Sequence, residues 1–427
     1  MRTEPGGAFV LEGQTVGPRG TRALRIGVED GVFVEPRDDL PVRAFTSGLL
    51  LPAGIDMHVH FRDPGAPQKE DFQTGTTAAA FGGIALVVDM PNTDPVTSTV
   101  DAYEAKLRAV RRKAVVDFGL AAGVDAKLRV FELGRRPLLY KLYAGPTTGD
   151  MLVEDEATWI EAARRATELG RPMSVHAEHP RLLEEARERA GPPDDPASHT
   201  RARPERAETA ALAVLARAGG ALVHVAHASH PNTLAAARRH GFSAEVAPHH
   251  LFLSTDDLPK LGAYGKMNPP LRDPRARTTL LAAFAADANV AAASDHAPHT
   301  IQEKEAGFAG APSGVPGVET MYPMLLAAAF AGEFPIARAV EACASRPADI
   351  LGLRRGRLEV GFAADFIHVT DTREPVRAER LHSRCGWTPF EGREAVFPQS
   401  VYVRGRPVVQ DGELVAAPGD GAAVEGV

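Results

Sequence analysis

From about Gly54 to Leu351, short apolar runs alternate with longer stretches in which apolar residues recur at helical spacing. This alternation is typical of strand–helix units whose parallel strands share one sheet. The candidate strands are residues 49–55, 85–90, 115–121, 138–143, 172–175, 221–226, 243–247 and 289–294. Helical stretches between them include residues 159–169, 208–218, 232–239 and 276–285. Eight such units predict a (β/α)₈ barrel, which we place at residues 51–356.

The two ends of the chain have a different pattern, with short β-rich runs separated by turn residues. Examples are residues 366–369, 401–403 and 407–411. Neither end alone is large enough to bury one face of a sheet. We therefore expect residues 1–50 and 357–427 to form one small composite β domain, a β-sandwich beside the barrel.

Charge and cysteine content exclude several classes of protein. The net charge of −7 is spread along the chain without a basic run, which argues against nucleic acid or an anionic membrane as a partner. No window resembles a membrane span or a secretory signal. The two cysteines, Cys343 and Cys385, form no CxxC pair, so neither a disulfide framework nor a thiolate metal site is expected. We expect a cytoplasmic protein.

Potential ligand side chains lie at the same end of seven of the eight candidate strands, and only the third strand lacks one. In a (β/α)₈ barrel, these C-terminal strand ends meet at one mouth, where active sites are found. The residues concerned are His58, His60 and Arg62, then Asn92, Lys141, His176, His227, His249 with His250, and finally Asp295, His296 and His299.

His58 and His60 are the sharpest local signal. Alternate residues of a strand point the same way, so both imidazoles can bind one metal ion. The alternative is two unrelated surface histidines. His176 and His227 are weak singly and gain weight from their strand-end positions, whereas Asp295 could both bind a metal and exchange a proton with a water.

Lys141 follows an apolar strand, where a lysine commonly pairs with a carboxylate or reaches solvent. Beside metal ions in a desolvated site its pKa would fall, and the neutral amine could take up CO₂. The resulting carbamate could bridge two metals.

Arg62 and Asn92 suit recognition of a substrate carboxylate, although a structural ion pair is the alternative for Arg62. A proline-stiffened loop at residues 266–272 could present Asn268 inward, and residues 144–151 have the small polar composition of a mobile loop over the site. We expect His249, His250 and His296 to pack or to support the ligands.

Several of these segments belong to motifs that run through most of the chain. They read DMHVHFRDPG at 56–65, KEDFQTGTTAAAFGG at 69–83, MPNT at 90–93, KLY at 141–143 and HAEH at 176–179. They continue with HVAHAS at 224–229, EVAPHHLFLS at 245–254, KMNPPLR at 266–272, ASDHAPHT at 293–300 and GVPGVET at 314–320. With these motifs the chain resembles the dihydroorotases of the amidohydrolase superfamily.

The resemblance implies a binuclear zinc site. His58 and His60 would hold one ion and His176 and His227 the other, with carboxylated Lys141 as the bridge and Asp295 completing the set. Asp150 is the alternative bridge, because many bacterial relatives use an aspartate from the corresponding loop. The implied substrate-binding residues are Arg62, Asn92, Asn268, His299, Ser313 and Gly314, with Thr147 and Thr148 on a loop that closes over the substrate.

The implied reaction is the reversible hydrolysis of (S)-dihydroorotate to N-carbamoyl-L-aspartate, the third step of de novo pyrimidine biosynthesis. The implied assembly is a homodimer, with possible association with aspartate transcarbamoylase. The alternatives are another cyclic amidohydrolase (a dihydropyrimidinase, hydantoinase or allantoinase) and a non-catalytic scaffold of the same fold. Fold analogy alone does not decide among them.

Overall fold

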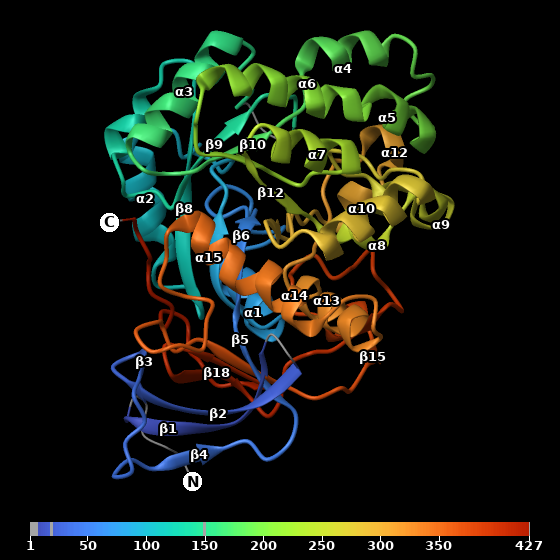
Figure 1. Cartoon of the computed structure of the whole chain (residues 1–427). Helices are drawn as coiled ribbons and strands as arrows, with labels where there is room; N and C mark the ends of the chain where they lie inside the picture. The colour runs from blue at the N-terminus through green and yellow to red at the C-terminus, as the bar shows by residue number, and fades with distance from the viewer. Residues whose placement is uncertain (1–6, 18–19, 148–150, 427) are drawn as a thin grey trace.

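A closed parallel barrel forms the centre of the molecule (Figure 1). The computed structural model describes residues 7–17, 20–147 and 151–426. The barrel strands are β6 (Gly54–Val59), β7 (Ile84–Asp89), β8 (Asp117–Gly123), β9 (Leu139–Tyr143), β10 (Met173–His176), β11 (Val223–Val225), β12 (Ser243–Val246) and β13 (Val290–Ala292). They lie side by side in chain order, and a parallel bridge between Val59 and His296 joins the last strand region to the first. The predicted (β/α)₈ barrel is confirmed.

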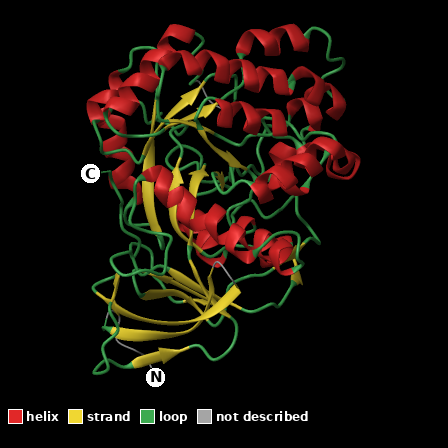
Figure 2. Ribbon diagram, viewed as in Figure 1, coloured by secondary structure: helices red, strands yellow, loops and turns green. Residues whose placement is uncertain are grey.

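Helices surround the barrel on the outside (Figure 2). The longer ones are α1 (Phe72–Phe81), α2 (Val100–Val110), α3 (Glu156–Glu168), α4 (Pro180–Arg187), α6 (Glu205–Leu215), α7 (Pro231–Arg239), α10 (Pro274–Ala286) and α13 (Met321–Phe330). Shorter ones are α5 (Pro196–Ala202), α8 (Pro248–Phe252), α14 (Ile336–Val340) and α15 (Arg346–Leu351). Local sequence explains their starts: Asp155 and Asp273 accept hydrogen bonds from the first free backbone N–H groups of α3 and α10. Among the described residues, no helix is both long and apolar enough to span a membrane.

The predicted strand at residues 49–55 is two strands. β5 (Leu49–Pro52) pairs antiparallel with β14 (Phe366–Val369) in a separate sheet, and β6 starts the barrel at Gly54. Both strands are buried throughout, so no change in alternation marks the switch between sheets. A side chain would be crowded at the start of β6, because a Cβ on Gly54 would lie 2.5 Å from Ile84 Cδ1.

Both ends of the chain build a β-sandwich below the barrel in Figure 1. One sheet has the order β3-β2-β1-β4, from β1 (Phe9–Gly17), β2 (Gly20–Glu29), β3 (Val32–Val34) and β4 (Val42–Ala44). The other has the order β19-β18-β17-β14-β5, with β17 (Ser400–Val403), β18 (Arg406–Gln410) and β19 (Glu413–Leu414). Leu11, Ile26 and Phe33 of the first sheet form one core with Leu50, Phe366 and Tyr402 of the second. The predicted fold class is confirmed, while the division at residues 50 and 357 stays a prediction.

One C-terminal stretch returns from the sandwich to the mouth of the barrel. We call residues 376–396 the return segment. Its Trp387 and Phe390 share a buried cluster with Leu253 and Met267 of the barrel loops. The Trp387 indole N–H donates to the His299 carbonyl oxygen at 2.8 Å. A second stretch, at the very end of the chain, pairs with β8 through Ala423 and Phe118. Neither contact is predicted by the sequence pattern.

Candidate active site

His58, His60 and Asp295 meet at the C-terminal mouth of the barrel, as their strand-end positions predict. The Nε2 atoms of His58 and His60 lie 3.4 and 3.3 Å from Asp295 Oδ1. One potential ligand atom from each residue lies within 4.8 Å of the other two. All three side chains are buried, so this cluster is a desolvated donor set of the type that binds a divalent cation.

The opposite edges of the two histidine rings are held by oxygen acceptors. His58 Nδ1 lies 2.5 Å from Glu245 Oε1, and His60 Nδ1 lies 2.6 Å from Asn92 Oδ1. A carboxylate or amide oxygen only accepts, so each Nδ1 carries the proton and each Nε2 directs its lone pair at the cluster. This is the tautomer that a metal-binding histidine needs, and the donor set therefore fits a metal ion.

Glu245 on β12 is a residue that the sequence analysis missed. It bonds His58 through Oε1 and His224 Nε2 through Oε2 at 2.9 Å. Burial opposes ionisation, but His58 and His224 hold the pKa of Glu245 well below its usual value. Its signal in the sequence was a lone acid inside an apolar strand, which needs a buried cationic or donor partner.

Glu245→Gln is expected to weaken metal affinity by roughly 10- to 100-fold, because an amide can present its N–H₂ to His58 and favour the wrong tautomer. Titration of the metal-free protein with zinc measures the effect. Glu319→Gln is the matched control, since Glu319 is also buried and bonded to a histidine, His382, away from the site. Equal zinc affinity of the Glu245 variant and the native protein would contradict this role.

His176 and His227 stand beside the first pair. His176 Nδ1 lies 3.0 Å from His227 Nε2, and the rings of His58 and His227 are 5.3 Å apart. Burial lowers the pKa of His227 and His60 well below the usual value and that of His58 to about 4. His58, His60 and His227 are therefore neutral at pH 7, as metal binding requires.

Lys141 of β9 lies against the same cluster. Its Nζ lies 3.3 Å from His58 Nε2 and 3.4 Å from Ser174 Oγ. Within the described residues no carboxylate forms an ion pair with it, and burial lowers the pKa of this amine to about 8. The role of Lys141 as a carbamate bridge stays a prediction. Thr148 and the alternative bridge, Asp150, lie outside the described residues.

A cavity opens beside the cluster. It is lined by His58, His60, Arg62, Asn92, Tyr143, Thr147, His176, His227, Asn268, Asp295, Ala297, Ser313 and Gly314. His299 lies behind this lining, with Nε2 3.1 Å from the Ser313 oxygen. Every predicted site residue within the described part of the chain thus lies in or next to one cavity. Their individual roles stay predictions.

Four polar atoms around this cavity are buried and have no hydrogen-bond partner among the described residues. They are Arg62 Nε, Tyr143 Oη, His227 Nδ1 and Asn268 Oδ1. Native proteins seldom leave such groups unsatisfied, so a polar ligand is expected to meet them. Tyr143 was missed, although it alternates with Lys141 on the same strand and therefore shares its face.

Arg62, His227 and Asp295 also share a strained backbone, with φ angles of 59°, 37° and 47°. This left-handed conformation costs a residue other than glycine of order 1–3 kcal/mol and persists where the surroundings enforce it. Arg62, His227 and Asp295 lie two or three residues beyond the ends of β6, β11 and β13. All three side chains line the cavity at the mouth of the barrel.

The chain is similar to known proteins of one family. A model described as the amidohydrolase family matches residues 49–408. A dihydroorotase of Methanosarcina acetivorans is 40% identical over 95% of this chain and 92% of its own length, and one of Halobacterium salinarum is 40% identical over 93% and 95%. The chain belongs to the dihydroorotases of the amidohydrolase family. The resemblance seen in the sequence is confirmed.

Solved amidohydrolase structures share the architecture. L-hydantoinase (dihydropyrimidinase) from Arthrobacter aurescens superposes with a TM-score of 0.91 over 98% of this chain and 99% of its own, at 24% identity. Dihydropyrimidinase from Brevibacillus agri gives a TM-score of 0.87 at 26% identity, over 98% of each chain. At 24% identity, the similarity to L-hydantoinase concerns the fold alone. The substrate therefore has to be inferred from the cavity.

Proposed function

We propose that this protein hydrolyses the ring amide of (S)-dihydroorotate to N-carbamoyl-L-aspartate and catalyses the reverse ring closure, the third step of pyrimidine biosynthesis. The observation that carries the proposal is Arg62. Its side chain is 6% exposed and lines the cavity, yet no described carboxylate forms an ion pair with it. A buried guanidinium without a counter-ion calls for an anionic ligand, and dihydroorotate carries a carboxylate.

Two zinc ions are proposed to bind in the cluster. His58 and His60 would hold one ion and His176 and His227 the other, with Lys141 as a CO₂-derived carbamate between them and Asp295 as a further ligand. When bound, the ions would supply Lewis acidity, which lowers the pKa of a water and polarises the ring carbonyl. Three observations support this assignment: His58, His60 and His227 are neutral, they lie beside His176, and Lys141 has no ion-pair partner among the described residues.

Asp295 is proposed to move the proton. Its Oδ1 lies at the centre of the histidine pair, and burial raises the pKa of this carboxyl above its usual value. A raised pKa suits a group that takes a proton from the attacking water and passes it to the leaving ring nitrogen. In ring closure, the same oxygen takes the proton back from the ureido nitrogen.

The wall of the cavity is proposed to hold the substrate in place. Arg62 would pair with the carboxylate through two N–H groups, with Asn92 beside it. Asn268 and the backbone at Ser313 and Gly314 would bond the ring polar groups. His299 donates Nε2–H to Ser313 oxygen and burial lowers its pKa to about 2, so it acts as a neutral group beside Arg62.

Arg62→Met is expected to lower kcat/KM for dihydroorotate by roughly 10²-fold, because losing one partner of a buried charge pair costs about 2–5 kcal/mol. Zinc content should stay at the native value. Arg181→Met, which removes an exposed guanidinium outside the cavity lining, is the control and should leave turnover unchanged. If the Arg62 variant loses zinc together with activity, Arg62 has a structural role instead.

A substrate comparison tests the proposal. The purified protein, with its zinc content known from elemental analysis, is assayed with dihydroorotate, dihydrouracil, hydantoin and allantoin. The last three lack a carboxylate, so kcat/KM is expected to be highest for dihydroorotate. A preference for one of the others would identify another cyclic amidohydrolase, and a fully metallated protein that turns over none would identify a scaffold.

The assembly and location are also proposals. The homodimer and the association with aspartate transcarbamoylase follow from the family, as does a place in the cytoplasm. Light scattering of the purified protein, alone and with that enzyme, tests both associations.

A further inference from the structure

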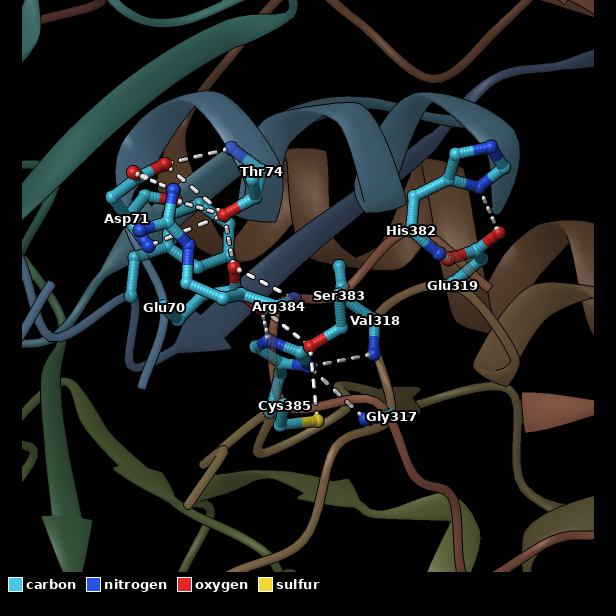
Figure 3. Close-up of polar contacts among 12 residues, drawn as sticks. Glu70, Asp71, Thr74, Gly317, Val318, Glu319, His382, Ser383, Arg384 and Cys385 are labelled. Carbon is cyan, nitrogen blue, oxygen red and sulfur yellow. Dashed lines mark hydrogen bonds and ion pairs between the residues drawn. The ribbon is translucent and has the colours of Figure 1, made fainter. Parts of the chain in front are cut away.

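A second buried polar network lies next to the active site, centred on Glu70 in the loop between β6 and α1 (Figure 3). The Glu70 side chain is fully buried. It accepts hydrogen bonds from the Thr74 hydroxyl, from Ser383 Oγ at 2.5 Å and from the Arg384 backbone N–H at 3.3 Å. Ser383 and Arg384 belong to the return segment, so this carboxylate joins the barrel to the C-terminal part of the chain.

The fourth partner of Glu70 is His296, the residue after Asp295. His296 Nε2 lies 3.3 Å from Glu70 Oε2. On the other edge of the ring, Nδ1 accepts the backbone N–H groups of Gly317 at 3.1 Å and Val318 at 3.4 Å. A nitrogen that accepts N–H groups carries no proton, so the proton is on Nε2 and is donated to Glu70. The carboxylate thereby selects the tautomer that keeps Gly317 and Val318 bonded.

The backbone of His296 is part of the barrel closure. Its oxygen accepts the His60 N–H at 2.7 Å, and it bridges Val59 on one side and Val315 on the other. Asp295, directly before it, has a φ of 47°, which would relax if its neighbour were free to move. The bonds from Gly317 and Val318 to Nδ1 prevent this movement, and Glu70 maintains them by keeping the proton on Nε2.

We propose that Glu70 is a positioning residue that acts through the His296 tautomer to hold the Asp295 carboxylate against His58 and His60. The return segment takes part, since Ser383 and Arg384 hold Glu70 in place from outside the barrel. The inference rests on the proposed function to the extent that Asp295 carries the proton. Residue 70 has to accept a hydrogen bond from the His296 Nε2–H, but it does not have to be charged.

This requirement gives a pair of variants. Glu70→Leu removes the acceptor and is expected to lower kcat roughly 10- to 100-fold, the usual effect of losing a partner that orients a site residue, with KM for dihydroorotate unchanged. Glu70→Gln keeps an acceptor oxygen and is expected to restore most of kcat. Loss in both variants, or in neither, would overturn the proposal.

A double variant separates positioning from general stability. In His296→Asn the amide oxygen replaces Nδ1 as the acceptor for Gly317 and Val318 and needs no tautomer selection. Adding Glu70→Leu to this background should cause no further loss of kcat, whereas independent losses would contradict the mechanism. If Glu70→Leu does not fold, the single variants His296→Asn and His296→Phe test the same mechanism. The asparagine variant should keep the native kcat, and the phenylalanine variant should lose it. Equal kcat values in the two variants would overturn the proposal.

His382→Ala is the control for the return segment. His382 bonds Glu319 at 2.8 Å and stacks on Phe81, so its loss loosens the same segment without touching Glu70 (Figure 3). Its kcat should equal the native value, and a fall as large as that of Glu70→Leu would assign the effect to the segment as a whole. Native protein inactive on dihydroorotate would instead refute the proposed function, and the same kcat ratios would then be measured on the cyclic amide that it does hydrolyse.

Discussion

Asp295→Asn is expected to reduce kcat for dihydroorotate by about 10⁴-fold. This is the upper end of what a positioned acid–base group contributes, because asparagine can neither accept the proton nor supply an anionic ligand oxygen. The side chain keeps its size, so the strained backbone and the contacts with His58 and His60 have no steric reason to change. Steady-state kinetics in both directions, with zinc content measured on the same sample, determine the effect.

Asp287→Asn is the matched control, since Asp287 follows α10 and makes no contact with the cavity. It should have native kcat. If Asp295→Asn stays within tenfold of the native kcat while zinc is retained, another group carries the proton.

Lys141→Met is expected to remove most of the bound zinc and to lower kcat by about 10³-fold or more, since Lewis-acid stabilisation is worth several kcal/mol. The physical reason lies in the pKa of about 8. At pH 7 roughly one amine in ten is neutral and able to react with CO₂, compared with fewer than about one in a thousand for an ordinary lysine. Methionine has similar length but cannot form a carbamate.

Carbon-13 NMR of protein prepared with labelled CO₂ measures the carbamate directly. Lys127→Met, at an exposed position, is the control. This variant should keep both the bound zinc and the carbon-13 label on Lys141. Full zinc occupancy and activity in Lys141→Met would show that the lysine is not the bridge, and Asp150→Asn would then be expected to abolish activity.

The barrel and the positions of its ligands could be predicted because both follow from local pattern. Apolar runs of strand length mark the barrel strands, and the parallel arrangement places every strand's C-terminal end at one mouth. Residues as far apart as His58 and Asp295 therefore meet without any long-range information. Lys141 could be placed by the same rule, since it precedes the end of β9 by two residues.

The groups that hold these ligands could not be predicted, because their partners are distant in sequence and leave no periodic signal. Glu245 is understood only once His58 is seen beside it, and Glu70 only once Ser383 arrives from the return segment. The change of sheet between β5 and β6 was missed for a related reason: Leu51 and Ile55 are both buried, on different sheets, in one apolar run.

The most direct measurement is a crystal structure of the zinc-loaded protein with dihydroorotate, with anomalous data collected at the zinc edge. We predict two zinc peaks between His58, His60, His176 and His227, continuous density joining Lys141 to both, and the substrate carboxylate on Arg62. Absence of zinc from this cluster, or a substrate bound with its carboxylate away from Arg62, would contradict the account.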